Sequence, residues 1–283
     1  MYPILTEDIR VRDPYIVPDK EAGKYYMFGT TDSDPWNGEG EGFLVYESVD
    51  LKHWSQPEYA FRPAADFWAE KNFWAPEAHF YRGSWYIFAS FIARGHRRGT
   101  QILKSDALTG PYAPISEGPV TPRDWECLDG TLYVDEKGKP WIVFCHEWVQ
   151  IHDGEICAMP LTEDLTASAG EPEVLFRASE APWVVSISKD VGNFVTDGPF
   201  LYRGSDGKLK MLWSSFSTGD YAIGVAESTT GSILGPWVQA EKPVVENGGH
   251  GMLFEDFEGK TWLSIHSPNA SPRERLLLVP FLK

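Results

Sequence analysis

Hydrophobic and polar positions alternate along this chain in short runs, the two-residue period that is typical of half-buried β-strands. In the first unit a polar start at residues 12–13 leads into an apolar run, a glycine turns the chain, and an aromatic run at Tyr25–Phe28 returns. This order occurs five times, and each occurrence predicts a β-hairpin. The five units begin near Asp13, Ala75, Asp129, Asp197 and His250.

Further apolar runs and Gly/Pro turns follow these hairpins, at residues 42–54, 100–112 and 221–237, and they predict a third and a fourth strand in each unit. Antiparallel units of four strands that repeat around an axis are the blades of a β-propeller. We therefore predict an all-β fold, a single five-bladed β-propeller with four-stranded antiparallel blades, as one domain over residues 1–283. The last unit contains only three apparent strands, and the pattern leaves open whether the N-terminus completes it.

The five starts, at residues 13, 75, 129, 197 and 250, lie 62, 54, 68 and 53 residues apart. These intervals exceed the roughly 40–50 residues of common propeller repeats. We expect the surplus to form loops, and loops on a rigid scaffold carry specificity.

Composition narrows the classes of partner. The chain is 42% hydrophobic and 14% aromatic, with a formal net charge of −16. Such acidity argues against nucleic acid and anionic membranes as partners, because both attract basic patches. It is compatible with a neutral sugar as substrate, although solubility alone explains most of it.

No run of apolar residues approaches the ~18 that a membrane span needs, and the first residues lack the basic start of a signal peptide. Cys127, Cys145 and Cys157 are odd in number and lack metal-type spacing, so we predict buried, reduced thiols. These features favour a cytoplasmic protein. Nothing in the sequence indicates an oligomeric state.

The first strand of each propeller blade lines the axis, so the five polar starts should meet at one face. Asp13, Asp129, Asp197 and His250 would then converge there. Asp-Gly and Asp-Pro pairs also cap ordinary turns, which is the alternative for any single aspartate. Three aspartates at the same repeat position favour a site, because clustered carboxyls raise one another's pKa and can divide acid and base roles.

These repeat starts resemble those of family 43 of the glycoside hydrolases, in the same order and over essentially the whole chain. The resemblance implies a five-bladed propeller. It also implies an inverting enzyme that acts on arabinofuranosides, xylosides and sometimes galactosides, without a cofactor. The motifs that carry it are Arg12-Asp13-Pro14, Phe73-Trp74-Ala75-Pro76-Glu77, Leu128-Asp129-Gly130, Asp197-Gly198-Pro199 and Gly249-His250-Gly251.

Carried over residue by residue, the resemblance assigns three catalytic aspartates. Asp13 would be the general base that activates water, and Asp129 would tune the pKa of the acid. Asp197 would be the general acid, although the family usually has the longer Glu before Gly-Pro. Glu147 is the alternative acid, and loss of activity is a third outcome of this departure.

The remaining predicted site residues concern substrate and metal. We expect Trp74, Glu77, Glu147 and Trp148 to bind sugar at the rim, and Arg275 to face inward beside the acids, with Arg273 as the alternative. His250 resembles an axial histidine that contacts a central ion or a water network in some members. A structural calcium near His250 is one possibility that this resemblance raises, and a histidine that is only hydrogen-bonded is the other.

Together these observations predict an exo-acting glycosidase that releases terminal α-L-arabinofuranose or β-D-xylose from plant-derived oligosaccharides. Two alternatives remain at this stage. One is an endo-acting arabinanase, and the other is a catalytically silent propeller that binds glycans.

Overall fold

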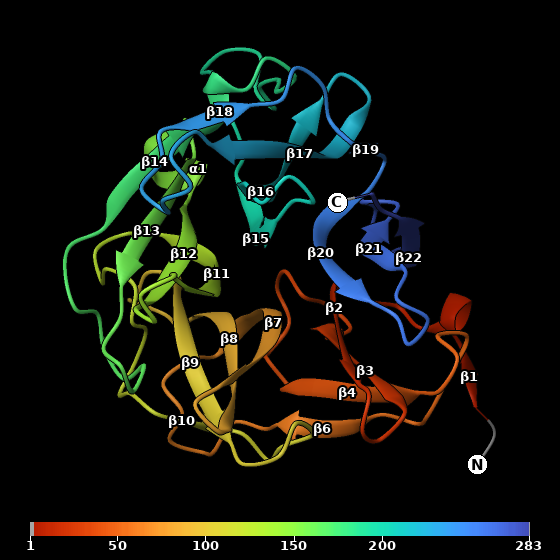
Figure 1. Ribbon diagram of the computed structural model, residues 1–283. Helices are drawn as coiled ribbons and strands as arrows, with labels where there is room; N and C mark the ends of the chain where they lie inside the picture. The colour runs from red at the N-terminus through yellow and green to blue at the C-terminus, as the bar shows by residue number, and fades with distance from the viewer. Residues whose placement is uncertain (1–2, 283) are drawn as a thin grey trace.

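The computed structural model describes residues 3–282, which form five antiparallel β-sheets arranged as blades around a central axis (Figure 1). This confirms the predicted all-β, five-bladed propeller. Each sheet is built from a continuous stretch of chain, so neighbouring strands are mostly consecutive in sequence. The innermost strands surround the axis in Figure 1 and are β2 (Arg12–Asp19), β7 (Lys71–Tyr81), β11 (Cys127–Val134), β15 (Asp197–Arg203) and β20 (Gly249–Glu255).

The other strands lie progressively further from the axis. The second strands are β3 (Lys24–Thr30), β8 (Ser84–Ile92), β12 (Pro140–His146), β16 (Leu209–Ser217) and β21 (Thr261–Ser267). The third strands are β4 (Phe43–Ser48), β9 (Gly99–Ser105), β13 (Glu155–Pro160), β17 (Asp220–Ser228) and β22 (Arg275–Pro280). Outer strands are β1 (Ile4–Leu5), β5 (His53–Trp54), β6 (Glu58–Phe61), β10 (Ala113–Pro114), β14 (Glu173–Arg177), β18 (Trp237–Gln239) and β19 (Val245–Glu246).

The blades differ in strand number, with six, four, four, five and three strands in chain order. The prediction of four strands per blade is therefore right only for the second and third blades. The first strand, β1, does not join the last blade, because it pairs with β5 of the first blade. An isolated bridge between Arg10 and Arg275 still joins the first residues to β22, so the ring is closed between its two ends.

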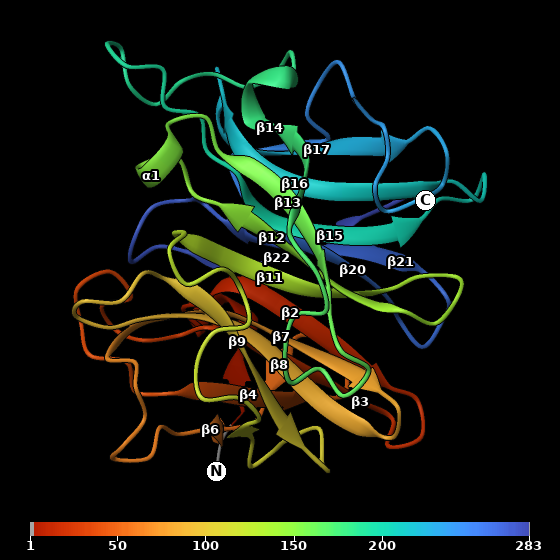
Figure 2. The ribbon, with the colours of Figure 1, turned by 90° about the vertical axis from the view of Figure 1, so that its left-hand side faces the viewer.

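Helical structure is confined to single turns: the 3-10 turns η1 (Thr6–Asp8) and η2 (Ala178–Glu180), and the short helix α1 (Trp148–Ile151). Within residues 3–282 no helix is long and apolar enough to cross a membrane. Figure 2 shows α1 and the loop that leads into β15 extending from the same side of the ring. This is the side on which β15 begins.

Each innermost strand is interrupted by a register shift near its start. The residue inside each shift has a positive φ, a conformation that costs a non-glycine residue roughly 1–2 kcal/mol. These residues are Asp13 (φ 54°), Ala75 (48°), Asp129 (54°), Gly198 (51°) and His250 (51°). Equivalent bulges at five blades therefore turn five backbone segments toward the axis in the same way.

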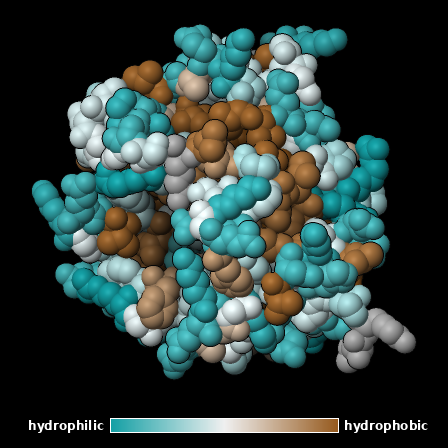
Figure 3. Space-filling view, turned by 45° about the vertical axis from the view of Figure 1, so that its right-hand side comes forward, coloured by the Kyte–Doolittle hydropathy of each residue, from teal (hydrophilic) through white to brown (hydrophobic). Residues whose placement is uncertain are grey.

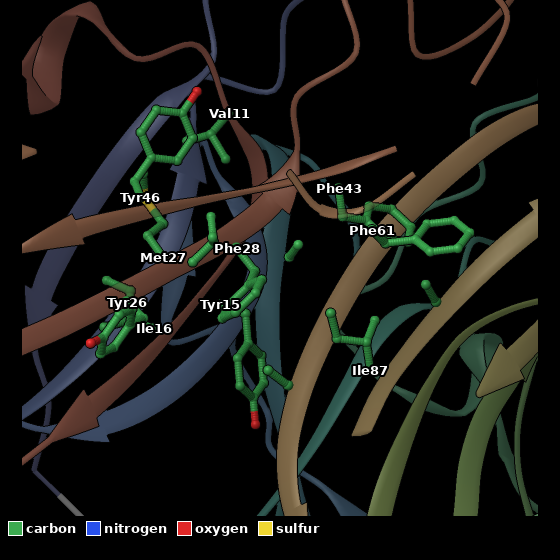
Figure 4. Packing of buried hydrophobic residues seen from close by; sticks show 14 of the residues in the cluster. Val11, Tyr15, Ile16, Tyr26, Met27, Phe28, Phe43, Tyr46, Phe61 and Ile87 are labelled. Carbon is green, nitrogen blue, oxygen red and sulfur yellow. The ribbon is translucent and has the colours of Figure 1, made fainter. Parts of the chain in front are cut away.

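The hydrophobic core lies within and between the blades. Figure 4 shows part of the largest cluster, in which Phe28, Phe43 and Phe61 are buried among side chains of the first two blades. The rings of Phe43 and Phe61 have centroids 5.8 Å apart. Burial of each such side chain stabilises the fold by roughly 1.5–3 kcal/mol, so the innermost strands are held on a rigid framework.

Polar side chains cover much of the outer surface (Figure 3). In the view of Figure 3 most of it is hydrophilic, with hydrophobic side chains gathered in patches near the middle. The three cysteines are all buried and unpaired, as predicted.

Candidate active site

A cavity of about 460 Å³ opens at the face where the innermost strands begin. It contains the three predicted aspartates and His250, which lie far apart in sequence. Its other charged side chains are Glu147, Arg12 and Arg98, and its aromatic side chains are Trp36, Trp74, Trp148, Phe216 and Tyr221.

Asp13 is the most firmly held of the carboxylates. Thr30 donates its hydroxyl to Oδ2 of Asp13 at 2.7 Å, and Oδ1 lies 3.3 Å from Nδ1 of His250. Burial opposes ionisation of Asp13, but His250 and then His266, with a smaller effect of Arg12, outweigh it and hold the pKa of this carboxyl well below its usual range. Asp13 is therefore an ionised carboxylate at neutral pH.

Asp129 lies close to the same nitrogen of His250 as Asp13 does. Its Oδ2 accepts the backbone N–H of Gly198 at 2.9 Å and lies 3.5 Å from Nδ1 of His250. Burial raises the pKa of Asp129 to about 6, with the negative charge of Asp13 adding to the shift and His250 opposing it. This carboxyl therefore titrates close to neutral pH.

Asp197 sits at the start of β15, where Tyr221 donates its hydroxyl to Oδ2 at 2.8 Å. Burial and then the negative charge of Asp129 raise the pKa of Asp197 to about 7. Asp13 and Asp197 thus have opposite tendencies in one cavity, since one stays ionised while the other retains its proton in mildly acidic solution.

Asp197 does not occupy the same repeat position as Asp13 and Asp129, contrary to the sequence prediction. In the strand register Asp197 pairs with Ser214 in the way that Arg12, the residue before Asp13, pairs with Thr30. Asp197 therefore corresponds to Arg12, and Gly198, which has the positive φ, corresponds to Asp13. A Cβ atom at Gly198 would lie 2.8 Å from Cγ of His250. Glycine is therefore required there, and the carboxyl of this blade comes from the preceding residue.

His250 itself is buried between carboxylates. Burial opposes its protonation, but Asp13 and then Asp129 outweigh this and raise the pKa of the imidazole. Its Nε2 is buried and has no hydrogen-bond partner among the described residues. Gly249, which precedes it, would overlap the ring of Tyr221 if it carried a Cβ.

The predicted calcium near His250 is not supported. Calcium takes six to eight oxygen ligands, whereas Nδ1 of His250 faces the same carboxylates that a cation would need. Across residues 3–282, no group of three or more His, Cys, Asp or Glu side chains is arranged to hold a metal ion. Nδ1 of His250 instead lies within ion-pair distance of Asp13 and Asp129.

Glu147 and Trp148 both line the cavity, together with Trp74. Glu147 is buried at the end of β12 and forms an ion pair with Arg98. Burial raises the pKa of Glu147 to about 7 although the Arg98 guanidinium opposes this shift. Glu147 therefore retains the properties of an alternative acid.

Two arginine–tryptophan pairs form one wall of the cavity. The guanidinium of Arg12 lies 5.0 Å from the ring centroid of Trp36, and that of Arg98 lies 4.4 Å from the ring of Trp74. The two tryptophan rings meet edge to face with centroids 5.2 Å apart. Trp36 is 47% exposed, so this wall offers a fixed aromatic surface to a ligand.

Two predicted binding residues lie outside the cavity lining. Glu77 is buried and accepts a hydrogen bond from Thr131 at 2.5 Å, so it is a buried group of β7 and not a rim residue. Arg275 donates to the backbone carbonyls of Glu7, Pro272 and Glu274. The inward-facing arginine is instead Arg12.

Sequence reasoning did not single out Arg12, Arg98 or Tyr221 as site residues. Arg12 was visible as the residue before Asp13, and its pairing with the buried Glu274 at 2.9 Å needed the fold. Arg98 directly precedes β9, and Tyr221 lies near the start of β17, next to the site. The only sequence signal was their position at strand ends that face the same side as Asp13.

Comparison with known proteins agrees with this architecture. Residues 2–278 match the glycosyl hydrolases family 43. The chain is similar to the crystal structure of an endo-arabinase from Bacteroides thetaiotaomicron, with 43% identity, a TM-score of 0.92, and coverage of 100% of this chain and 98% of that one.

Two characterised relatives are also similar. The extracellular exo-α-(1→5)-L-arabinofuranosidase ArbA of Cellvibrio japonicus is 23% identical over 92% of this chain and 74% of its own length. The extracellular endo-α-(1→5)-L-arabinanase 1 of Bacillus subtilis is 25% identical over 49% of this chain and 44% of its own.

The fold and the cavity define a five-bladed propeller with an acid–base carboxyl cluster at one end of its axis. The chain belongs to family 43 of the glycosyl hydrolases.

Proposed function

We propose that this protein hydrolyses α-(1→5)-linked L-arabinofuranosyl bonds of arabinan-type chains with inversion at the anomeric carbon. The observation that carries the proposal is the pairing of an ionised Asp13 with a protonated Asp197 in one cavity. The choice of arabinan is supported by the endo-arabinase, exo-arabinofuranosidase and endo-arabinanase to which the chain is similar.

The proposed reaction uses one water molecule. Asp13 accepts a proton from the water at its carboxylate, which Thr30 and His250 hold in place. The water oxygen attacks the anomeric carbon from the side opposite the leaving oxygen, and Asp197 donates its proton to that oxygen as the glycosidic bond breaks. Asp129, being negatively charged, keeps the proton on Asp197. These steps involve no cofactor.

The rest of the cavity suits a neutral sugar ring. Both arginines are paired with buried glutamates, Arg12 with Glu274 and Arg98 with Glu147, so neither is left as a free cation for an acidic substrate. Trp36, Trp74 and Trp148 supply apolar faces on which a sugar can stack.

Exo action was expected from the sequence, on the ground that a deep five-sided funnel favours attack at a chain end unless rim loops open it into a cleft. Endo action is a second candidate, favoured by a second cavity of about 190 Å³ beside the first. Arg98 lines both cavities, and Trp68 and His96 line the second, with ring centroids 5.8 Å apart. A chain longer than the first cavity could continue over Arg98 onto these rings.

The experiment is incubation with linear arabinan and with chromogenic arabinofuranoside, xyloside and galactoside, using Asp13→Asn as the matched inactive control. The proposal expects arabinan hydrolysis that the control lacks, with the product anomer inverted in proton NMR during turnover. Free arabinose from the first minutes would indicate exo action, and a ladder of oligosaccharides would indicate endo action. Activity no higher than that of Asp13→Asn on every substrate would favour the catalytically silent glycan-binding propeller.

A further inference from the structure

Neighbouring blades are joined near the axis by a repeated hydrogen bond. In each case the backbone N–H of the positive-φ residue of one blade donates to a side chain on the second strand of the preceding blade. The bonds run from Asp13 to His266 Nδ1 (3.2 Å), Ala75 to Thr30 Oγ1 (2.8 Å), Asp129 to Ser90 Oγ (2.9 Å) and His250 to Ser214 Oγ (2.8 Å).

The acceptors occupy equivalent places in the strand register. Each pairs with the residue just before the positive-φ position of its own blade, as Thr30 pairs with Arg12 and Ser214 with Asp197. The same register in the third blade pairs Leu128 with Cys145. Cys145 is therefore the residue at which the fourth blade would find its acceptor.

The bond between the third and fourth blades takes a different course. The N–H of Gly198, the positive-φ residue of the fourth blade, donates to Oδ2 of Asp129 at 2.9 Å. A thiol sulfur is a weak acceptor, whereas a carboxylate oxygen is a strong one. Cys145 is fully buried and stays a neutral thiol, because burial and the nearby Asp129 and Asp197 raise its pKa well above the ordinary value.

The hydrogen bond from Gly198 to Asp129, in place of one to residue 145, has consequences for the acid–base cluster. The Gly198 N–H both orients the Asp129 carboxylate and favours its ionised form. Gly198 also follows Asp197 directly, so the bond fixes the two carboxyls relative to each other. A hydroxyl at position 145 would offer the Gly198 N–H the kind of acceptor that Thr30, Ser90 and Ser214 provide at three of the other blade junctions.

We propose that Cys145 is a positioning residue of the active site, whose poor acceptor sulfur leaves the Gly198 N–H to the Asp129 carboxylate. The proposal deepens the proposed function and rests on it for its kinetic consequence. For Asp197 to act as the acid it must hold a proton while Asp129 is ionised, and the Gly198 N–H favours this distribution by stabilising the Asp129 carboxylate.

The experiment compares Cys145→Ser, which supplies an acceptor, with Cys145→Ala, which supplies none. Carboxyl titration by ¹³C NMR on aspartate-labelled protein should show the apparent pKa of Asp129 rising by about one unit in Cys145→Ser, the tenfold change typical of one hydrogen bond to a charged group. Cys145→Ala should titrate like the native protein. If serine prevents folding, Cys145→Thr replaces it, since threonine is the natural residue at the equivalent position 30.

Activity gives a second readout. Cys145→Ser should lower kcat on arabinan several-fold with little change in KM, while Cys145→Ala should stay within about twofold of the native enzyme. Equal titration curves in all three proteins, or the same shift in Cys145→Ala as in Cys145→Ser, would overturn the proposal. A shift confined to Cys145→Ser in a protein without activity would uphold it and refute the proposed function instead.

Discussion

The phenolic hydroxyl of Tyr221 donates to Oδ2 of Asp197 across 2.8 Å, and joins the third strand of the fourth blade to the carboxyl proposed as general acid. This bond stabilises the ionised form of Asp197, so it opposes the increase in pKa that burial and Asp129 produce. Tyr221 also stacks on His266, with ring centroids 5.7 Å apart, so its position is fixed.

Tyr221→Phe should therefore move the alkaline limb of kcat/KM to higher pH. Without the donated hydrogen bond the pKa of Asp197 rises above about 7, and the acid keeps its proton into more alkaline solution. A several-fold loss of kcat should accompany the shift, because Asp197 is less well oriented. A pH profile identical to that of the native enzyme would show that Asp197 is not the titrating acid.

Asp129→Asn should move the same limb in the opposite direction. The negative charge of Asp129 raises the pKa of Asp197, so its removal lowers that pKa and deprotonates the acid at lower pH. Rates measured from pH 4 to 9 should show the alkaline limb displaced downward and a reduced maximum. A shift in the same direction as in Tyr221→Phe would contradict the assigned role of Asp129.

The identity of the acid can be decided by two isosteric variants. If Asp197 is the acid, Asp197→Asn should lose a factor of about 10²–10⁴ in kcat on substrates with a poor leaving group, the usual contribution of a general acid. Glu147→Gln should lose less of kcat, because it breaks the ion pair with Arg98 but leaves Asp197 in place as the proton donor. The reverse order of losses would assign the acid to Glu147.

Asp197→Asn should also stabilise the fold in alkaline solution. A pKa of about 7 in the folded protein, against an ordinary value of 3.8, means that the folded state binds more protons than the unfolded state between about pH 4 and 7. This carboxyl therefore contributes stability below that window and loses it as the pH rises through it. Thermal unfolding should show a higher Tm for Asp197→Asn than for the native protein at pH 8, and a smaller difference at pH 4.

The comparison of Arg12 with Arg275 shows what limited the sequence analysis. The sequence shows Arg12 directly before Asp13 and Arg275 in the last of the five units. Only the three-dimensional register decides which of the two guanidinium groups faces the cavity. Arg12 begins β2 and is paired with Glu274, while Arg275 is engaged by three backbone carbonyls of its own neighbourhood. Glu77 is a similar case. The sequence analysis placed it at the rim, but a shift of one strand position is enough to turn a side chain from the rim into the interior.

The sequence by itself determined the five repeats, the propeller and the convergence of Asp13, Asp129, Asp197 and His250, because strand periodicity and Gly/Pro turns are local signals that recur in order. Only the tertiary structure decided that Asp197 precedes its bulge, that Tyr221, Thr30 and Gly198 hold the carboxyls, and that His250 lies between two of them. These contacts join different blades or depend on the register within a blade. They arise from how strands pack around an axis, which no single stretch of sequence encodes.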